Sequence, residues 1–191
     1  MAAVFTELQK QKLMHMFELL DVDGNGVLEY DDFRMVVDTM AEERGWERNN
    51  RRYISLVASN KRLWTMISRN IDIDSDGSIT LMEWLAFHIK AFIEDPMTKG
   101  FDPKFSAALR GTATFFCDML DSDGDGKVCI DDYIAFCAAY NVSEAKARLS
   151  FGLFDRDGSG DITVQEVEEM VKEFYLSDDP MAPGNLFFGN L

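Results

Sequence analysis

Hydrophobic residues recur along the chain with the three- to four-residue spacing of amphipathic helices. The first run places Leu13, Met16 and Leu20 on one face, a pattern that predicts a helix packed against a core. Thr6 and Gln9 have the spacing of a capping box, in which each residue bonds the backbone amide of the other. We therefore expect the first helix to begin near Thr6.

Similar helical runs follow in pairs, and each pair flanks a short acidic segment. The apolar faces expected before the later acidic segments are Trp64, Ile67 and Ile71; Ala113, Phe116 and Leu120; and Ala147, Phe151 and Phe154. Those expected after the four segments are Phe33, Val36, Val37 and Met40; Trp84, Phe87 and Ala91; Tyr133, Phe136, Cys137 and Tyr140; and Val167, Met170, Val171 and Phe174. The pattern predicts an all-α protein of four helix-loop-helix units.

The four acidic segments share one twelve-residue pattern, Asp-x-[Asp/Asn]-x-[Asp/Asn]-Gly-x5-Glu, with small variations. This is the EF-hand calcium loop, in which positions 1, 3, 5 and 12 offer side-chain oxygens and position 7 a backbone carbonyl. The predicted metal ligands are Asp21, Asp23, Asn25, Val27 and Asp32; Asp72, Asp74, Asp76, Ser78 and Glu83; Asp121, Asp123, Asp125, Lys127 and Asp132; and Asp155, Asp157, Ser159, Asp161 and Glu166.

These residue types suit a hard dication, because Ca²⁺ takes six to eight oxygen ligands and glycine at position 6 permits the sharp turn. One such loop alone can be an inert acidic turn. Four in phase, each with flanking helices, favour up to four Ca²⁺ sites. Position 8 is apolar in every loop, which predicts short strands that pair the loops: Leu28, Ile79, Val128 and Ile162.

Position 12 differs among the loops and predicts different metal preferences. Glu83 and Glu166 are long enough to hold an ion with both oxygens, whereas Asp32 and Asp132 are one methylene shorter. The shorter residues ligate through one oxygen unless the loop contracts, and a contracted six-oxygen site suits Mg²⁺. We therefore expect loops two and four to be the better Ca²⁺ sites, and loops one and three to be weaker or to bind Mg²⁺. In loop four, Ser159 lowers the charge, and Asp161 restores some of the negative field.

The loops begin at residues 21, 72, 121 and 155, so the first two intervals are much longer than the last. The long first interval predicts extra helical turns or an inserted segment around residues 45–60. Prolines at 96 and 103 and a glycine at 100 mark the best linker, at residues 94–104. We expect two lobes: an N-terminal EF-hand pair at 1–95, and a C-terminal pair at 100–191 that carries an apolar tail.

Composition narrows the partners and the compartment. The chain has 34 acidic and 19 basic residues, a formal charge of −15, which disfavours nucleic acid and anionic membranes as partners. A hydrophobic content of 47% argues against disorder. Three cysteines without metal-ligand spacing indicate reduced thiols and a cytoplasmic location. We expect neither a signal peptide nor a membrane span.

Several features together resemble the sarcoplasmic calcium-binding protein family of invertebrates, and within it the calexcitin-like members. They are the long first interval, the segment Val27-Leu28-Glu29-Tyr30-Asp31-Asp32-Phe33, and the ending Gly184-Asn185-Leu186-Phe187-Phe188-Gly189-Asn190-Leu191. The resemblance covers nearly the whole chain. It implies a compact, two-lobe, cytosolic protein that buffers Ca²⁺ and Mg²⁺, and for calexcitin-like members it also implies neuronal signalling.

The chain is also similar to coelenterazine-dependent photoproteins and luciferin-binding proteins, through the segment His15-Met16-Phe17 before the first loop. Photoproteins place a histidine in the last helix, but residues 168–175 contain none. This departure argues against light emission and leaves open a small-molecule ligand. A lone helical histidine more often serves structure, which is how we interpret His15 and His88.

The remaining question is whether the protein buffers or signals. Leu186, Phe187, Phe188 and Leu191 are costly to expose, so we expect the tail to fold back between the lobes and occupy the surface that a sensor offers its target. A buffer is therefore the preferred interpretation, with a calcium-dependent signalling protein and a carrier of a coelenterazine-like molecule as alternatives. Nothing in the chain resembles an enzyme's nucleophile, phosphate loop or zinc site, so we expect no enzymatic activity.

Overall fold

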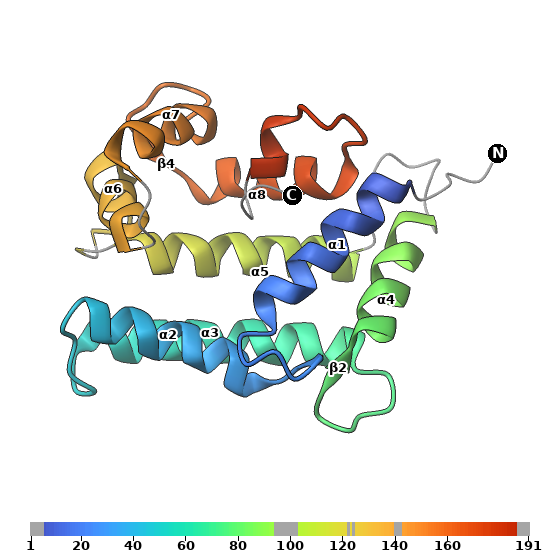
Figure 1. Cartoon of the computed structure of the whole chain (residues 1–191). Helices are drawn as coiled ribbons and strands as arrows, with labels where there is room; N and C mark the ends of the chain where they lie inside the picture. Colours follow the sequence, from blue (N-terminus) through green and yellow to red (C-terminus); the bar gives the residue numbers. More distant parts are fainter. Residues whose placement is uncertain (1–5, 94–102, 122, 124, 140–142, 187–191) are drawn as a thin grey trace.

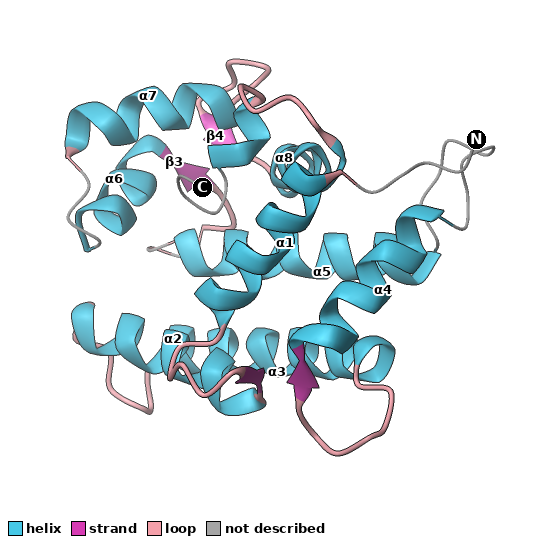
Figure 2. Ribbon diagram, turned by 45° about the vertical axis from the view of Figure 1, so that its right-hand side comes forward, coloured by secondary structure: helices cyan, strands magenta, loops and turns pink. Residues whose placement is uncertain are grey.

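The computed structural model describes residues 6–93, 103–121, 123, 125–139 and 143–186. The helices in this part of the chain are α1 (Glu7–Leu20), α2 (Tyr30–Glu43), α3 (Arg51–Ile71), α4 (Leu81–Ile93), α5 (Pro103–Leu120), α6 (Ile130–Ala139), α7 (Glu144–Phe154) and α8 (Val164–Leu176), with a 3₁₀ turn η1 (Pro183–Leu186). The strands are β1 (Val27–Leu28), β2 (Ile79–Thr80), β3 (Val128–Cys129) and β4 (Asp161–Ile162). The all-α fold of four helix-loop-helix units is confirmed (Figures 1 and 2). No described helix is long and apolar enough to cross a membrane.

Local capping signals set the helix starts, as the sequence predicts. Thr6 and Gln9 form the expected capping box at α1, with the two bonds at 2.9 and 3.2 Å. Thr163 and Glu166 form another box at α8. Ser143 occupies the N-cap position of α7, but its side chain makes no capping hydrogen bond.

The loops pair through two-stranded antiparallel ribbons, which confirms the predicted role of position 8. Leu28 lies opposite Ile79, and Val128 lies opposite Ile162. All four side chains are at most 2% exposed. Each pair of loops is therefore joined rigidly at its centre, so that a shift in one loop is transmitted to its partner.

The two EF-hand pairs share one hydrophobic core. In Figures 1 and 2, α5 runs beside α3 of the N-terminal pair and beside α8 of its own pair. The core cluster contains residues from both pairs, among them Leu13, Ile67, Ala113 and Phe174. The predicted boundary between residues 95 and 100 lies outside the described residues, so the division into domains stays a prediction.

Helix length accounts for the unequal spacing of the loops. The helix that enters loop two, α3, has 21 residues, whereas α7, which enters loop four, has 11. Extra helical turns are therefore a large part of the long first interval. Pro103 belongs to the first turn of α5 instead of the linker, a position where its missing amide costs nothing.

The segment after α8 returns to pack on α1 and α8. Lys12, which is 1% exposed, donates to the Ser177 carbonyl (2.5 Å) and to Asn185 Oδ1 (2.8 Å). Burial lowers the pKa of Lys12. The Gly184 amide donates to Glu173 Oε2 at 2.7 Å. The sequence predicts that the apolar tail folds back between the lobes. That prediction concerns the Leu186 side chain and residues 187–191, which lie outside the described part of the structure.

Candidate metal centres

Each of the four loops gathers acidic oxygens into a compact group. Within each group, one oxygen from every residue lies within 4.8 Å of the others. The groups are Asp21, Asp23 and Asp32; Asp72, Asp74 and Asp76; Asp121, Asp123 and Asp132; and Asp155, Asp157 and Glu166. Like charges so close together repel one another unless a cation lies between them.

The first ligand of every loop is held in the same way. The amide of the position 6 glycine donates to Oδ2 of the position 1 aspartate, at 2.8 to 3.1 Å. These glycines, which are Gly26, Gly77, Gly126 and Gly160, have φ between 85° and 95°, a region that other residues rarely adopt. The bond fixes the aspartate and leaves its Oδ1 for other partners.

The predicted ligands at positions 3 and 5 point their oxygens back into the loop. The position 5 amide donates to the position 3 carboxylate in each loop, at 2.9 to 3.2 Å. The position 7 amide donates in turn to the position 5 oxygen, from Val27, Ser78, Lys127 and Asp161. Successive amides thus orient successive carboxylates and preorganise the loop for a cation.

The position 12 carboxylate closes three of the loops by bonding amides at both ends. Glu83 accepts from Ile73 and Thr80, both at 2.9 Å, and Glu166 makes the equivalent bonds at 2.9 and 2.8 Å. Asp32 spans the same gap despite its shorter side chain, at 3.0 Å to Val22 and 2.8 Å to Glu29. Loop one has therefore contracted, which is one of the two outcomes considered for an aspartate at this position.

Loop two departs from the other loops at position 12. Glu83 does not belong to the compact group of its loop and is only half-buried, whereas Asp32, Asp132 and Glu166 are 2 to 7% exposed. Hydrogen bonds from the Thr80 and Ile73 amides lower the pKa of Glu83, so the carboxylate is ionised and oriented. Its oxygens must approach Asp72 for a dication to bridge all four side chains.

One atom in loop two supports the assignment to a metal directly. Asp72 Oδ1 is buried and has no hydrogen-bond partner among the described residues. A buried, unsatisfied polar atom costs about 1–3 kcal/mol, and more when charged. A dication at the centre of the loop would satisfy this oxygen, so the residues present fit Ca²⁺.

The position 7 side chains of loops three and four meet across the second ribbon. Lys127 Nζ lies 2.8 Å from Asp161 Oδ2, so the Asp161 charge is offset by Lys127 and adds less field to loop four than the sequence suggests. The Ser159 hydroxyl donates to the Asp161 carbonyl at 3.0 Å. That carbonyl is the predicted position 7 ligand, and the bond orients it.

Two contacts near loop three were not predicted. The Cys129 thiol donates to Asp132 Oδ2 at 3.0 Å, and this bond raises the pKa of Cys129. Arg52, which precedes the loop by 69 residues, contacts Asp121. The basic composition of residues 44–52 was the only signal of such a contact, because sequence spacing does not reveal which loop a distant arginine approaches.

Comparisons with known proteins agree with this geometry. The family model described as "EF hand" matches residues 13–37, 69–88 and 148–171. Calerythrin of Saccharopolyspora erythraea is 25% identical over 171 residues, which cover 90% of this chain and 94% of that protein. Sarcoplasmic calcium-binding protein 1 of Astacus leptodactylus is 28% identical, with 91% of both chains covered.

A solved structure extends the likeness to the fold. The coelenterazine-binding protein of Renilla muelleri, in its calcium-loaded apo form, superposes with a TM-score of 0.68 at 19% identity, covering 97% of this chain and 99% of that one. The family match, the full-length relatives and the four acidic groups point to one conclusion. The chain is built from EF-hand units and is similar, over nearly its whole length, to the sarcoplasmic calcium-binding proteins.

Proposed function

We propose that this calcium-binding EF-hand protein acts mainly as a cytosolic buffer, which binds Ca²⁺ reversibly while Mg²⁺ competes at the weaker loops. The ligands are those predicted in the four loops. Each loop supplies three or more oxygens from Asp, Glu, Asn or Ser and one backbone carbonyl, which are the hard ligands that Ca²⁺ and Mg²⁺ prefer. Three free cysteines support a reducing compartment.

The observation that carries the buffer proposal is the shared core of the two EF-hand pairs. A sensor of the open-groove type exposes a hydrophobic face when Ca²⁺ binds. Here the helix faces that follow the loops are already packed: Val37, Trp84, Val171 and Phe174 are at most 2% exposed. Opening one pair would expose core shared with the other pair, so the cost of opening is high.

Dye binding with and without metal tests this proposal. A hydrophobic dye should bind no better to the Ca²⁺-loaded protein than to the Mg²⁺-loaded protein, because loading tightens a closed core. A large Ca²⁺-specific increase in dye fluorescence would contradict the buffer role and favour a calexcitin-like signalling protein with a protein target.

The metal assignment rests on position 12. We propose that loops one and three, with Asp32 and Asp132, are the sites where Mg²⁺ competes, because a contracted loop approaches the tighter octahedron of Mg²⁺. The contraction of loop one supports this assignment. Loop three shares the short residue, and loops two and four keep the longer glutamate.

A small-molecule carrier is the remaining alternative, given the fold shared with a coelenterazine-binding protein. Aromatic side chains fill the space between α4 and α8. His88 stacks on Tyr175 with ring centres 5.3 Å apart, and the ring centres of Trp84 and His88 are 4.3 Å apart. This packing favours a structural role. Solvent extraction of the purified protein checks it, since a stoichiometric chromophore in the extract would favour the carrier.

A further inference from the structure

The C-terminal end of α5 receives its cations from the other EF-hand pair. The last turn of α5 has no basic residue of its own, although exposed helix carbonyls favour nearby positive charge. Arg44, just after α2, donates to the Met119 carbonyl at 3.0 Å. Arg52, in the first turn of α3, donates to the Asp121 carbonyl at 2.5 Å. Two arginines of the N-terminal pair therefore hold the segment that leads into loop three.

Arg52 also reaches the first metal ligand of loop three. Its Nη2 lies 3.4 Å from Asp121 Oδ1, and the two side chains are 23% and 13% exposed. The Gly126 amide donates to Oδ2 of the same carboxylate, so Arg52 approaches the opposite oxygen, Oδ1. A guanidinium in this position partly neutralises the Asp121 carboxylate, as a bound dication would.

Among the described residues, the same oxygen of the other three loops contacts no side-chain cation. In loop two, the equivalent atom, Asp72 Oδ1, has no partner among the described residues. In loops one and four, this oxygen accepts from an amide of its own loop, Asn25 at 3.0 Å or Ser159 at 2.9 Å. Among the contacts resolved for the four position 1 aspartates, the side-chain cation at loop three is the exception.

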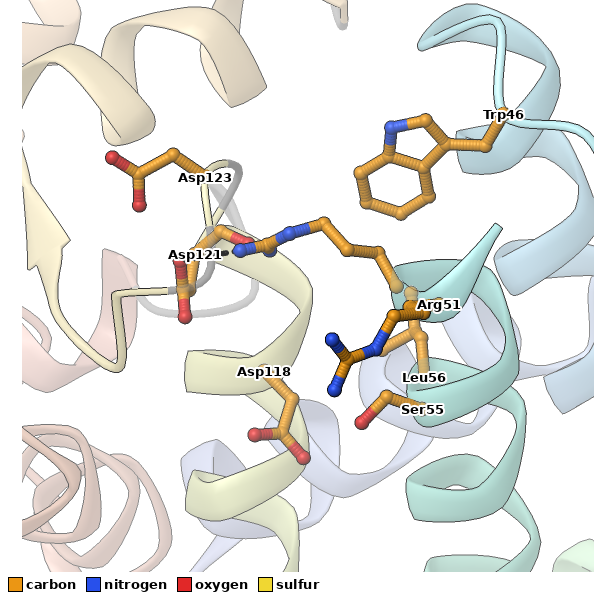
Figure 3. A pocket seen from close by; sticks show the side chains of 8 residues that line it. Trp46, Arg51, Ser55, Leu56, Asp118, Asp121 and Asp123 are labelled. Atoms are coloured by element: carbon orange, nitrogen blue, oxygen red, sulfur yellow. Dashed lines mark hydrogen bonds and ion pairs between the residues drawn. The ribbon is translucent and has the colours of Figure 1, made fainter. Parts of the chain in front are cut away.

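The surroundings leave the arginine room to move. An open cleft of about 470 Å³ lies between the start of α3 and loop three. Figure 3 shows Asp118, Asp121 and Asp123 on one side of this cleft, and Trp46 and Arg51 on the other. A guanidinium displaced from Asp121 would enter solvent, close to other carboxylates, without any rearrangement of the core.

We propose that Arg52 is a built-in competitor of the metal at loop three. Its charge lowers the affinity of that loop, and metal binding there loosens the contact between loop three and the N-terminal pair. By linkage, the coupling is reciprocal: any change that moves the start of α3 alters the affinity of loop three. This inference rests on the proposed binding of Ca²⁺ by the loops and adds the residue that sets the strength of one of them.

A site-resolved titration tests the inference. The amide resonance of Gly126 reports on loop three, and those of Gly26, Gly77 and Gly160 report on the other loops of the same molecule. Arg52→Gln should tighten Ca²⁺ binding at loop three by about tenfold, the effect of removing a unit charge about 5 Å from a dication in water. The other three loops should change much less.

Two further variants separate this effect from general electrostatics. Arg62→Gln removes the same charge from an exposed position on the same helix, and should leave the Gly126 titration nearly unchanged. Arg52→Lys keeps the charge and should stay close to the unaltered protein. Unchanged or weaker binding in Arg52→Gln, or equal tightening in Arg62→Gln, would overturn the inference.

The unaltered protein supplies an independent check that needs no variant to fold. The Nε–H resonance of Arg52 should shift as loop three fills, because the guanidinium leaves Asp121, and a resonance that stays constant to saturation would refute the displacement. If none of the four glycine amides responds to Ca²⁺, the proposed function itself fails. If they respond but Arg52 has no effect, only this inference fails.

Discussion

At the scale of single residues, small differences at equivalent positions distinguish four otherwise similar loops. Asp32 reaches the same position 2 amide as the longer Glu166, at 3.0 against 2.9 Å, because loop one has closed around it. Glu83 has the longer side chain but stands outside the compact group of loop two. Side-chain length and loop closure therefore act together, and metal preference follows from both.

Lengthening position 12 of loop one should shift its preference from Mg²⁺ toward Ca²⁺. In Asp32→Glu, the second carboxylate oxygen becomes available as a ligand, and we expect Ca²⁺ affinity at this loop to rise roughly tenfold, in line with one added charge-assisted contact. The Gly26 amide resonance, followed through a Ca²⁺ titration, measures the affinity of this loop. Asp31→Glu, the same change at the exposed neighbouring position, is the control, and an equal rise there would contradict the explanation.

His88 should make stability depend on pH. Burial lowers the pKa of His88 to about 4, and its Nδ1 donates to the Trp84 carbonyl at 2.7 Å. Because the unfolded chain binds the proton with a pKa near 6.5, stability contributed by neutral His88 is complete above about pH 6.5 and is lost as the pH falls toward 4.

Comparison with a variant isolates this effect from the carboxylates that titrate in the same range. The free energy of unfolding of the unaltered protein should fall more steeply than that of His88→Gln between pH 6.5 and 4, by about 3 kcal/mol in total. Denaturant unfolding at saturating Ca²⁺ measures it. Parallel pH profiles for the two proteins would show that folding does not lower the pKa of His88.

At the scale of secondary-structure elements, close backbone approaches fix how the segment after α8 packs. A Cβ at Gly184 would lie 2.7 Å from the Phe174 amide nitrogen and 2.7 Å from Glu173 Cβ. At Gly111, where α5 meets α3, it would lie 2.3 Å from Met66 Cε, the far end of a flexible side chain. The backbone of Phe174 cannot move aside for a Cβ at Gly184, whereas the Met66 side chain can move aside for one at Gly111.

These two glycines form a matched pair of substitutions. Gly184→Ala should cost about 1–3 kcal/mol, because the segment must move away from α8. Gly111→Ala should cost less, since Met66 can change rotamer and alanine favours the helix by roughly 1 kcal/mol. Thermal unfolding of both variants at saturating Ca²⁺ compares them, and a larger loss in Gly111→Ala would contradict this account of the packing.

The elements also show what the sequence can predict. Capping boxes, the glycines of the loops and the buried position 8 residues depend on neighbours a few positions away, and the pattern predicts them correctly. The contacts of Lys12 with Asn185 and of Arg52 with Asp121 join residues 173 and 69 positions apart. Such contacts depend on how the helices pack, which periodicity does not specify.

At the scale of the whole molecule, repulsion among the acidic loops opposes the packing of the shared core until cations bind. The formal charge of −15 destabilises the compact state through self-repulsion. Four Ca²⁺ ions would reduce it to −7. Since both EF-hand pairs contribute to one core, loss of metal from one pair should weaken the packing of the other.

Removing the metal should therefore lower thermal stability. A ligand present at 100 times its Kd stabilises the folded state by about 2.7 kcal/mol per site, equivalent to roughly 5–10 °C in Tm for a chain of this size. Calorimetric scans with Ca²⁺ and with chelator, at equal ionic strength, measure the difference. An unchanged Tm in chelator would mean that folding and metal binding are not coupled.

Calorimetric titration of the metal-free protein with Ca²⁺, with and without Mg²⁺, tests the central claim most directly. We predict reversible binding of up to four Ca²⁺, with Mg²⁺ reducing the apparent affinity of the loops that carry Asp32 and Asp132 and leaving those with Glu83 and Glu166 largely unaffected. Absence of Ca²⁺ binding would contradict the assignment of the four acidic groups as metal centres. Equal competition by Mg²⁺ at every site would contradict the role given to position 12.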